Sequence, residues 1–484
     1  MILEIRSGTD TMGILKINAR DPVATRHQNV TLKYAVVILV TAAIINFTGV
    51  AWSNTDINPV FAIKGTLVDS EEGETSDSGF ITTISPGILV ERQGPRSTLA
   101  LDYQLNAVYN GGFDESEDEV VHLLDFFTDY EHKPGKWISS LQANSRLTNI
   151  DVNGRQNTRP EFIDDNTTEL RTILADTELT DKLGDSVSYR TRAFMNYATF
   201  ADSDDGDDTR GKGLLFELNN FRSQADFTWT AELASELLED DINETQFDTF
   251  NAILNYRVSS NWSSFVDYTR TELDTPQFED NKTLLGVIWA PNRRTFVSLG
   301  AGKRGNDDER NDTYSFEARS ERKRVTYSAT YDEDITTARS AVFDQIVDGG
   351  FATPTTDSIS ISPVLQKRAT VNIEAFGKYS TYRLSIFETD RSGSDIEDDQ
   401  TIIGILLAYD YVLSEREQIS VTLLGQEIES VETSDLLDLE ATYSRLLSES
   451  ETVDLGFGWA EQDSTDVEDE YKRVFVSAAY RIIF

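Results

Sequence analysis

The last eleven residues, VFVSAAYRIIF, are the feature that most constrains how this 484-residue chain can fold. Apolar or aromatic residues occupy every second position, and Ser477 and Arg481 lie on the alternate face, so the period is two. This period predicts a β-strand at the very end of the chain. An apolar strand at a free end invites edge pairing and aggregation unless it is covered. Two interpretations remain: a buried terminal strand of a soluble sheet, or the closing strand of a membrane barrel, where lipid covers the apolar face.

The same segment resembles the carboxy-terminal signature of bacterial outer-membrane barrels, which end on Phe with apolar residues at the alternate positions before it. The resemblance implies that Tyr480, Ile482 and Phe484 form an assembly signal. It also implies that the barrel assembly machinery is the partner that recognises the signal.

The composition narrows the choice of fold class and of partners. Hydrophobic residues make up 39% of the chain and the mean hydropathy is -0.38, which excludes a bundle of membrane helices. Transmembrane strands escape such averages, because only alternate residues face lipid. The chain has no Cys, which excludes disulfides and thiol-based metal or nucleophile chemistry. The formal net charge of -41 argues against nucleic acid as a partner, since phosphates would be repelled.

One uncharged apolar stretch near the start, YAVVILVTAAIINFTGVAWS, follows Lys33. Small residues at its end suit cleavage after Ser53, so residues 1–53 are predicted to be a secretory signal peptide and residues 54–484 the mature barrel. The alternative is an uncleaved helical anchor, because about 20 residues can just cross a bilayer. Met1 and Met12 are both candidate start residues.

Strand-like stretches with alternating apolar and polar residues recur through the rest of the chain. LALDYQLNAVY, at 99–109, and VDLGFGWA, at 453–460, are two clear examples. Strands of about ten residues, apolar on one face, fit a tilted membrane barrel. The prediction is an all-β fold: a single transmembrane antiparallel up-and-down β-barrel of about 22 strands, with 18–20 as alternatives. A large soluble sandwich would also alternate.

The connections between these stretches distinguish the two architectures. Short and long connections alternate along the chain, as in a barrel with short periplasmic turns and long outer loops. With a first strand near 61–68, both termini fall on the periplasmic side. The predicted short turns are at 93–96, 132–136, 182–185, 259–261, 291–294, 321–324 and 414–417. The predicted long, mostly acidic connections are at 71–78, 111–119, 202–208, 239–244, 305–310 and 390–399.

Three stretches carry a likeness to a known family: ISPGILVERQGPRSTLALDYQLNAVYN, VIWAPNRRTFVSLGAGKR and the residues after Val371. They resemble the β-barrel porins associated with PEP-CTERM and exopolysaccharide gene systems, and the likeness covers nearly the whole mature chain. It implies an outer-membrane barrel in Gram-negative cells. Its motifs are strand and turn patterns, and the family has no catalytic residues to carry over.

The histidines do not suggest an enzyme. An outer-membrane hydrolase needs a base beside a nucleophile, commonly His with Ser or Asp. Of the three His residues, His27 leaves with the signal, and His122 and His132 are expected at different heights without a neighbouring Ser motif. We predict no catalytic site and no cofactor.

The run DSDDGDD at 202–208 resembles a calcium-binding loop only loosely, because Gly206 falls at position five and Gly213 stands at position twelve. A solvated loop is one interpretation. The other is that its carboxylates share divalent cations with anionic lipopolysaccharide, since the two surfaces would otherwise repel each other. The candidate cation ligands are Asp202, Asp204, Asp205, Asp207 and Asp208.

Several arginines alternate with apolar residues and are expected to face the lumen. A guanidinium presents a planar fork to carboxylates or phosphates, so these residues are candidates for solute contact. The alternative is a structural network in which Glu317, Glu232 or Asp267 pairs with them. The candidates are Arg190, Arg192, Arg257, Arg319 and Arg383.

The longest connection, from Ile335 to Ser362, contains Phe343, Ile346 and Phe351 among polar residues. A loop fully exposed to water gains nothing from such groups, so a lid over the barrel mouth is expected, with a disordered loop as the alternative.

Two functions follow from this sequence. The first is a passive pore or export conduit, with polysaccharide as a candidate solute. The second is a structural or adhesive surface barrel whose lumen is plugged and whose acidic outer loops make the contacts. A TonB-type receptor is disfavoured, because few residues separate Ser53 from the first strand.

Overall fold

The computed structural model describes residues 55–72, 75–111, 119–149, 159, 161–162, 166–201, 208–220, 226–239, 244–274, 278–306, 310–337, 363–393, 399–430, 433–465 and 469–484. These residues form one 22-stranded sheet. Its strands are β1 Thr55–Glu72, β2 Thr75–Gln93, β3 Ser97–Gly111, β4 Glu119–Lys133, β5 Trp137–Asn149, β6 Thr167–Leu183, β7 Val187–Phe200, β8 Thr209–Asn220, β9 Phe227–Glu239, β10 Glu244–Arg257, β11 Trp262–Leu273, β12 Phe278–Asn292, β13 Thr295–Gly305, β14 Arg310–Arg322, β15 Val325–Thr337, β16 Pro363–Phe376, β17 Ser380–Ser392, β18 Gln400–Ser414, β19 Glu417–Glu429, β20 Thr433–Leu446, β21 Glu451–Ser464 and β22 Tyr471–Ile483.

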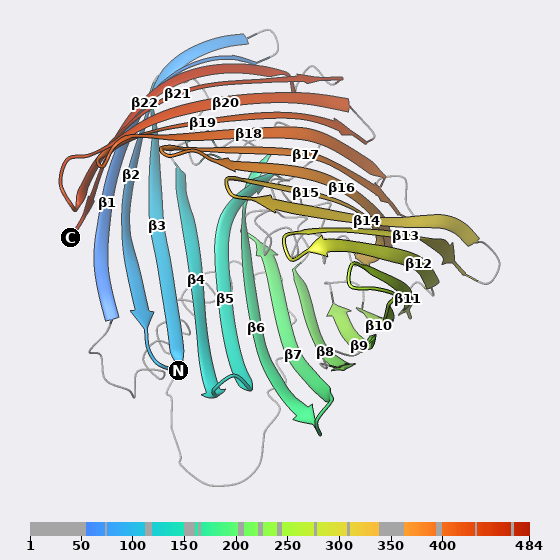
Figure 1. Ribbon diagram of the computed structural model, residues 1–484. Coiled ribbons are helices and arrows are strands. Elements are labelled where there is room, and N and C mark those ends of the chain that lie inside the picture. Colours follow the sequence, from blue (N-terminus) through green and yellow to red (C-terminus); the bar gives the residue numbers. More distant parts are fainter. Residues whose placement is uncertain are drawn as a thin grey trace, which may run out of the picture. The chain divides into compact units, whose positions relative to one another are not determined.

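The sheet closes on itself, which confirms the predicted antiparallel barrel and its count of 22 strands. Each strand pairs with the next one in the chain, and β22 returns to β1. The closing register runs from Val60 opposite Ile483 to Glu72 opposite Tyr471. The backbone N–H of Phe484 donates to the carbonyl of Pro59 at 2.9 Å, so the final residue also belongs to this seam. Figure 1 shows β1, in blue, beside β22, in red.

All of the predicted short turns join consecutive strands, for example Gly94 to Arg96 between β2 and β3. Two of them contain glycines with positive φ, Gly135 at 66° and Gly184 at 74°, a conformation that glycine adopts without a steric penalty. The acidic connection expected at 71–78 is wrong, because β1 continues to Glu72 and β2 begins at Thr75. Ladder hydrogen bonds can continue into water, so acidic residues do not end these strands.

The strands are also longer than the ten or so residues expected from the sequence. They range from 11 residues in β13 to 19 in β2, and β1 spans 18 residues instead of the 61–68 core predicted for it. About 9–11 tilted residues cross a bilayer. Most strands therefore have more residues than a membrane crossing needs.

The two faces of the sheet carry different side chains, as β22 demonstrates. Val474 and Val476 are 36% and 53% exposed, whereas Phe475 between them is 2% exposed. Residues that are paired across neighbouring strands lie on the same face of the sheet. Leu67 of β1 and Phe457 of β21 both oppose Val476, so all three side chains lie on the outward face. The outward face is therefore apolar. Other exposed outward side chains are Met195, Leu214, Leu233, Leu285, Leu299, Leu407 and Leu455.

Some expectations fall outside the described residues. The predicted signal peptide does, as do Asp202 to Asp207 and the connection from residue 338 to residue 362 that was expected to form a lid. Within the part of the chain that is described, no helix is long and apolar enough to cross a membrane.

Candidate functional site on the lumen wall

The predicted lumen arginines lie on several strands around the barrel and do not form one cluster. Arg190 and Arg192 alternate on β7 with the outward Met195, and Arg257, Arg319 and Arg383 lie on β10, β14 and β17. The register places each of them on the face opposite to the exposed apolar side chains. Whether a solute contacts them remains a prediction.

Four of these arginines pair with carboxylates that the sequence did not suggest. Of the expected partners Glu317, Glu232 and Asp267, Glu232 does interact electrostatically with Arg190. The contacts at ion-pair distance are made with other cross-strand or same-strand neighbours. Arg190 Nε lies 3.2 Å from Glu217, Arg192 Nη2 2.9 Å from Asp176, Arg319 Nη2 2.5 Å from Glu321, and Arg383 Nη2 2.6 Å from Asp410.

The histidines are far apart, as predicted, but His132 does have a serine within reach. Its Nε2 lies 3.0 Å from Ser139 Oγ across the β4–β5 hairpin, a pairing that the sequence analysis missed. The serine hydroxyl donates to Thr177 Oγ1 at 2.9 Å, and the histidine ring stacks on Trp137. A nucleophile needs a base oriented by a third group. Here the hydroxyl is directed to a threonine, so the arrangement is that of an aromatic cluster beside a turn.

Of the acidic run, only Asp208 is described, and it accepts a hydrogen bond from Tyr197 Oη at 2.7 Å. Among the described residues, no group of three or more His, Asp or Glu side chains is arranged to hold a metal ion.

The most developed site in the lumen involves the connection between β5 and β6. Arg159, Glu161 and Phe162 of this connection, which we call the docked segment, lie against the inner wall of the barrel. The backbone N–H of Phe162 donates to the carbonyl of Arg159 at 3.0 Å, which holds these two residues close together. Its contacts reach β20, which is separated from β5 along the wall by β4, β3, β2, β1, β22 and β21. The segment therefore lies inside the barrel, across part of its width.

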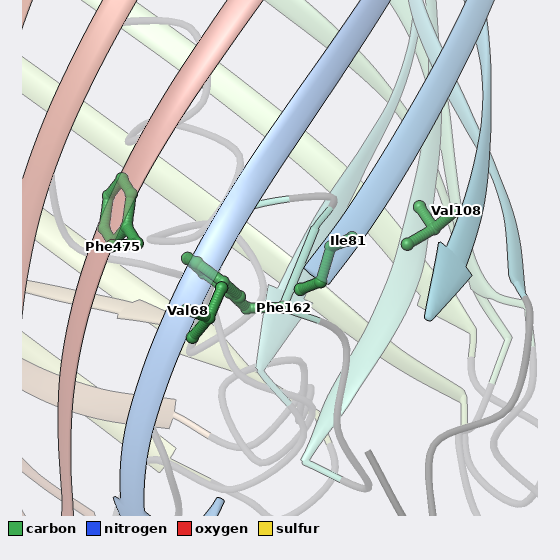
Figure 2. Close-up of a cluster of buried hydrophobic side chains, with 5 residues drawn as sticks. All are labelled: Val68, Ile81, Val108, Phe162 and Phe475. Atoms are coloured by element: carbon green, nitrogen blue, oxygen red, sulfur yellow. The ribbon is translucent and has the colours of Figure 1, made fainter. Parts of the chain in front are cut away.

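Phe162 anchors the docked segment through apolar contacts. Only 6% exposed, it packs with four inward residues of β1, β2, β3 and β22. Its ring lies 5.2 Å from that of Phe475 in an edge-on arrangement. Burying a Phe side chain stabilises by about 1.5–3 kcal/mol. Figure 2 shows Phe162 beside Val68, with Ile81, Val108 and Phe475 on the neighbouring strands.

Arg159 makes the charged contact of the segment. Its Nη2 lies 2.8 Å from both carboxylate oxygens of Asp438 and 3.3 Å from Glu440 Oε2. Its guanidinium also stands over the ring of Phe475, 4.9 Å from the centroid. Burial by itself would lower the pKa of Arg159, but the two carboxylates outweigh burial and raise the pKa above its ordinary value. Arg159 is thus held as a cation against the wall.

Two further contacts complete the docking. Lys64 Nζ of β1 lies 2.5 Å from Glu161 Oε1, and Glu161 is only 6% exposed. Arg473 of β22 lies over the ring of Phe162, 4.4 Å from its centroid, and its Nη2 is 3.6 Å from Glu72. The docked segment and the wall therefore contact each other through ion pairs and aromatic rings. Each of the buried charges in this arrangement has a partner of opposite charge.

This site was not predicted from the sequence, although one signal pointed to it. The connection between β5 and β6 is polar apart from a few residues such as Phe162. As in the longest connection, an apolar side chain gains nothing from exposure to water, so Phe162 would be expected to be buried against the barrel. No local pattern identifies the wall partners, because Arg159 and Asp438 are 279 residues apart in the chain.

No model of a protein family matches the sequence, and no curated protein matches it. Among solved structures, the barrel is similar to the siderophore receptor PirA from Acinetobacter baumannii, with a TM-score of 0.50 and 9% identity over 90% of this chain and 81% of that one. It is similar to the same degree, 0.50 and 9%, to the FrpB iron transporter from Neisseria meningitidis (F3-3 variant), over 88% of this chain and 81% of that chain. The likeness shows the fold alone.

Proposed function

We propose that the protein is a pore or export conduit of the Gram-negative outer membrane. The observation that carries this proposal is the division of the closed barrel into an apolar outward face and a charged inward face. Outward valines and leucines such as Val476 and Leu285 suit lipid, whereas inward ion pairs such as Arg192 with Asp176 suit water. A soluble barrel would reverse this pattern, because its interior is the hydrophobic core.

The docked segment supports a lumen that is narrowed along one side. Its described contacts are with β1, β2, β3, β20 and β22, which lie in one stretch of the wall with β21 between β20 and β22. The inward ion pairs of β7, β14 and β17 lie elsewhere around the barrel, and the paired arginines there are 35–55% exposed. A wall of exposed, paired charges is what a hydrated path requires.

The partners in this proposal are lipopolysaccharide, the barrel assembly machinery and a solute. The strand ends and acidic connections opposite the short turns would lie outside, where Asp202, Asp204, Asp205, Asp207 and Asp208 would share divalent cations with lipopolysaccharide. The barrel assembly machinery would read the carboxy-terminal strand, and polysaccharide is the solute that the family resemblance suggests. The chain would need no cofactor and no nucleic acid.

Single-channel conductance in planar bilayers tests the proposal. Purified full-length protein, shown to be folded by its heat-modifiable migration, should give discrete current steps in 1 M KCl. A folded protein that inserts and gives no steps would contradict the pore. That result would favour the structural or adhesive barrel with a plugged lumen.

A further inference from the structure

The wall residues that hold Arg159 form a site of their own, which we call the cradle: Asp438 and Glu440 of β20 with Phe475 of β22. The sheet register fixes their positions. Glu440 opposes Gly458 of β21, and Gly458 opposes Phe475. The three strands are held by their own ladders, so the cradle does not depend on the β5–β6 connection for its geometry.

Gly458 gives the cradle its shape. A Cβ atom at this position would lie 1.9 Å from Cζ of Phe475, so the phenyl ring occupies the space that a side chain would fill. The ring therefore leans across β21 toward β20, on which the two carboxylates lie. A ring face beside two carboxylates is the arrangement that a guanidinium group prefers, since it can stack on the ring and hydrogen-bond the oxygens.

From this geometry we infer that the cradle is a binding site for the guanidinium group of a solute in the lumen, and that Arg159 is its built-in occupant. Arg159 comes from a connection outside the sheet, whereas every other member of the site is part of the wall. A tethered group competes at an effective concentration in the millimolar range. A solute bearing a guanidinium group can therefore exchange with Arg159, and binding of the solute is coupled to release of the docked segment.

Other charges near the cradle do not change this assignment. Arg473, which the register places beside Ala460 and so next to Asp438, has Glu72 as its own partner at 3.6 Å. Lys64 pairs with Glu161 of the docked segment. The inference rests on the proposed function only for the route by which a solute reaches the lumen, because binding to the cradle needs no conductance.

Calorimetry on the detergent-solubilised full-length protein tests the inference, with arginine amide as the probe. The comparison ligand is citrulline amide, whose ureido group is the uncharged isostere of the guanidinium. Arg159→Ala should bind arginine amide at least about tenfold more tightly than the parent, since a hydrogen bond to a charged group contributes that much or more. Arg159→Ala combined with Asp438→Asn should lose the gain. Arg146→Ala, which removes another inward arginine, on β5 beside Asp125, is the matched control and should show no gain.

Several outcomes would overturn the inference: equal affinity of the parent and Arg159→Ala for arginine amide, retention of the gain in the double variant, or equal binding of citrulline amide. Arg159→Gln keeps most of the side-chain volume and replaces the alanine variant if that one does not fold. Conductance is recorded on the same samples. A protein that binds arginine amide and does not conduct would refute the pore and support the cradle as a binding site. A protein that conducts and does not bind arginine amide would support the pore and refute the cradle.

Discussion

Two parts of this barrel join residues that are far apart in the chain, and they do so by different forces. The seam between β1 and β22 is a backbone ladder whose register runs from Val60 to Glu72. The described contacts that hold the docked segment on the lumen wall are made by the side chains of Arg159, Glu161 and Phe162. In the proposed membrane setting, the outer side of the seam would face lipid, where an unpaired backbone group would have no water to bond. The docked segment faces a lumen lined by charges.

The difference predicts unequal consequences when each part is disturbed. Opening the seam would expose two rows of backbone donors and acceptors to the membrane, so the seam forms completely or the barrel does not form. Releasing the docked segment removes no ladder hydrogen bond. Its charges can be solvated by water in the lumen, so its loss should change the lumen and leave the barrel folded.

Deletion of Phe484 should have the largest effect, because it alters the seam at the end of the closing strand. The backbone N–H of Phe484 bonds to Pro59, and the side chain is 68% exposed and so available for recognition. We expect a strong loss of heat-modifiable barrel in outer-membrane fractions. Phe457→Ala, which removes an outward phenyl from β21 and keeps the end of the chain, is the control. Normal barrel levels after the deletion would show that the final residue does not direct assembly.

A charge placed on either face of the seam should separate lipid from lumen. Ala478 and Ala479 are adjacent on β22, and Ala478 shares the outward face with Val476. Ala478→Arg should lower the free energy of unfolding by about 2–4 kcal/mol, the cost of an arginine at the lipid midplane. Ala479→Arg should cost less, because the residue faces inward, where Asp454 on one side offsets Lys64 on the other. Urea titration in lipid vesicles measures both. Equal costs would mean that the two faces of the seam meet similar surroundings.

Phe162→Ala should release the docked segment and leave the seam intact. Removing the phenyl group weakens docking by about 1.5–3 kcal/mol, the free energy of burying it. We expect a larger single-channel conductance with unchanged heat-modifiability. Phe216→Ala is the control, since this residue is 38% exposed on the outward face of β8. A folded Phe162→Ala protein that conducts like the parent would show that the segment does not narrow the path.

Cysteine labelling should decide which compartment the long connections face. Of the changes proposed here, these cysteine substitutions should have the smallest effect on stability. Asp205 belongs to an acidic connection, and Asn292 is the last residue of β12, next to the turn that leads to β13. The chain has no Cys, so single cysteine variants have no background. Asp205→Cys should react with an impermeant maleimide on intact cells and Asn292→Cys should not. The reverse result would invert the proposed topology.

The sequence by itself determined the barrel architecture. Alternation with period two, as at 453–460, and turn chemistry, as at Gly135 and Gly184, are local properties, and each strand pairs with its neighbour in the chain. The strand ends were less predictable, because the polar residues at 71–72 and 75–78 belong to β1 and β2 instead of ending them. The acidic residues there predicted exposure to solvent, and both loops and the ends of strands can be exposed to solvent.

Only the tertiary structure decided what meets inside the barrel. Closure brings β22 to β1 and so places Phe475 beside Val68, and the path of the β5–β6 connection places Arg159 against Asp438. The partners of the lumen arginines also depend on register, as for Arg190 and Glu217. A side chain's sequence neighbours set the face on which it lies. Its contacts across the lumen depend on how all 22 strands close, and no local pattern records that closure.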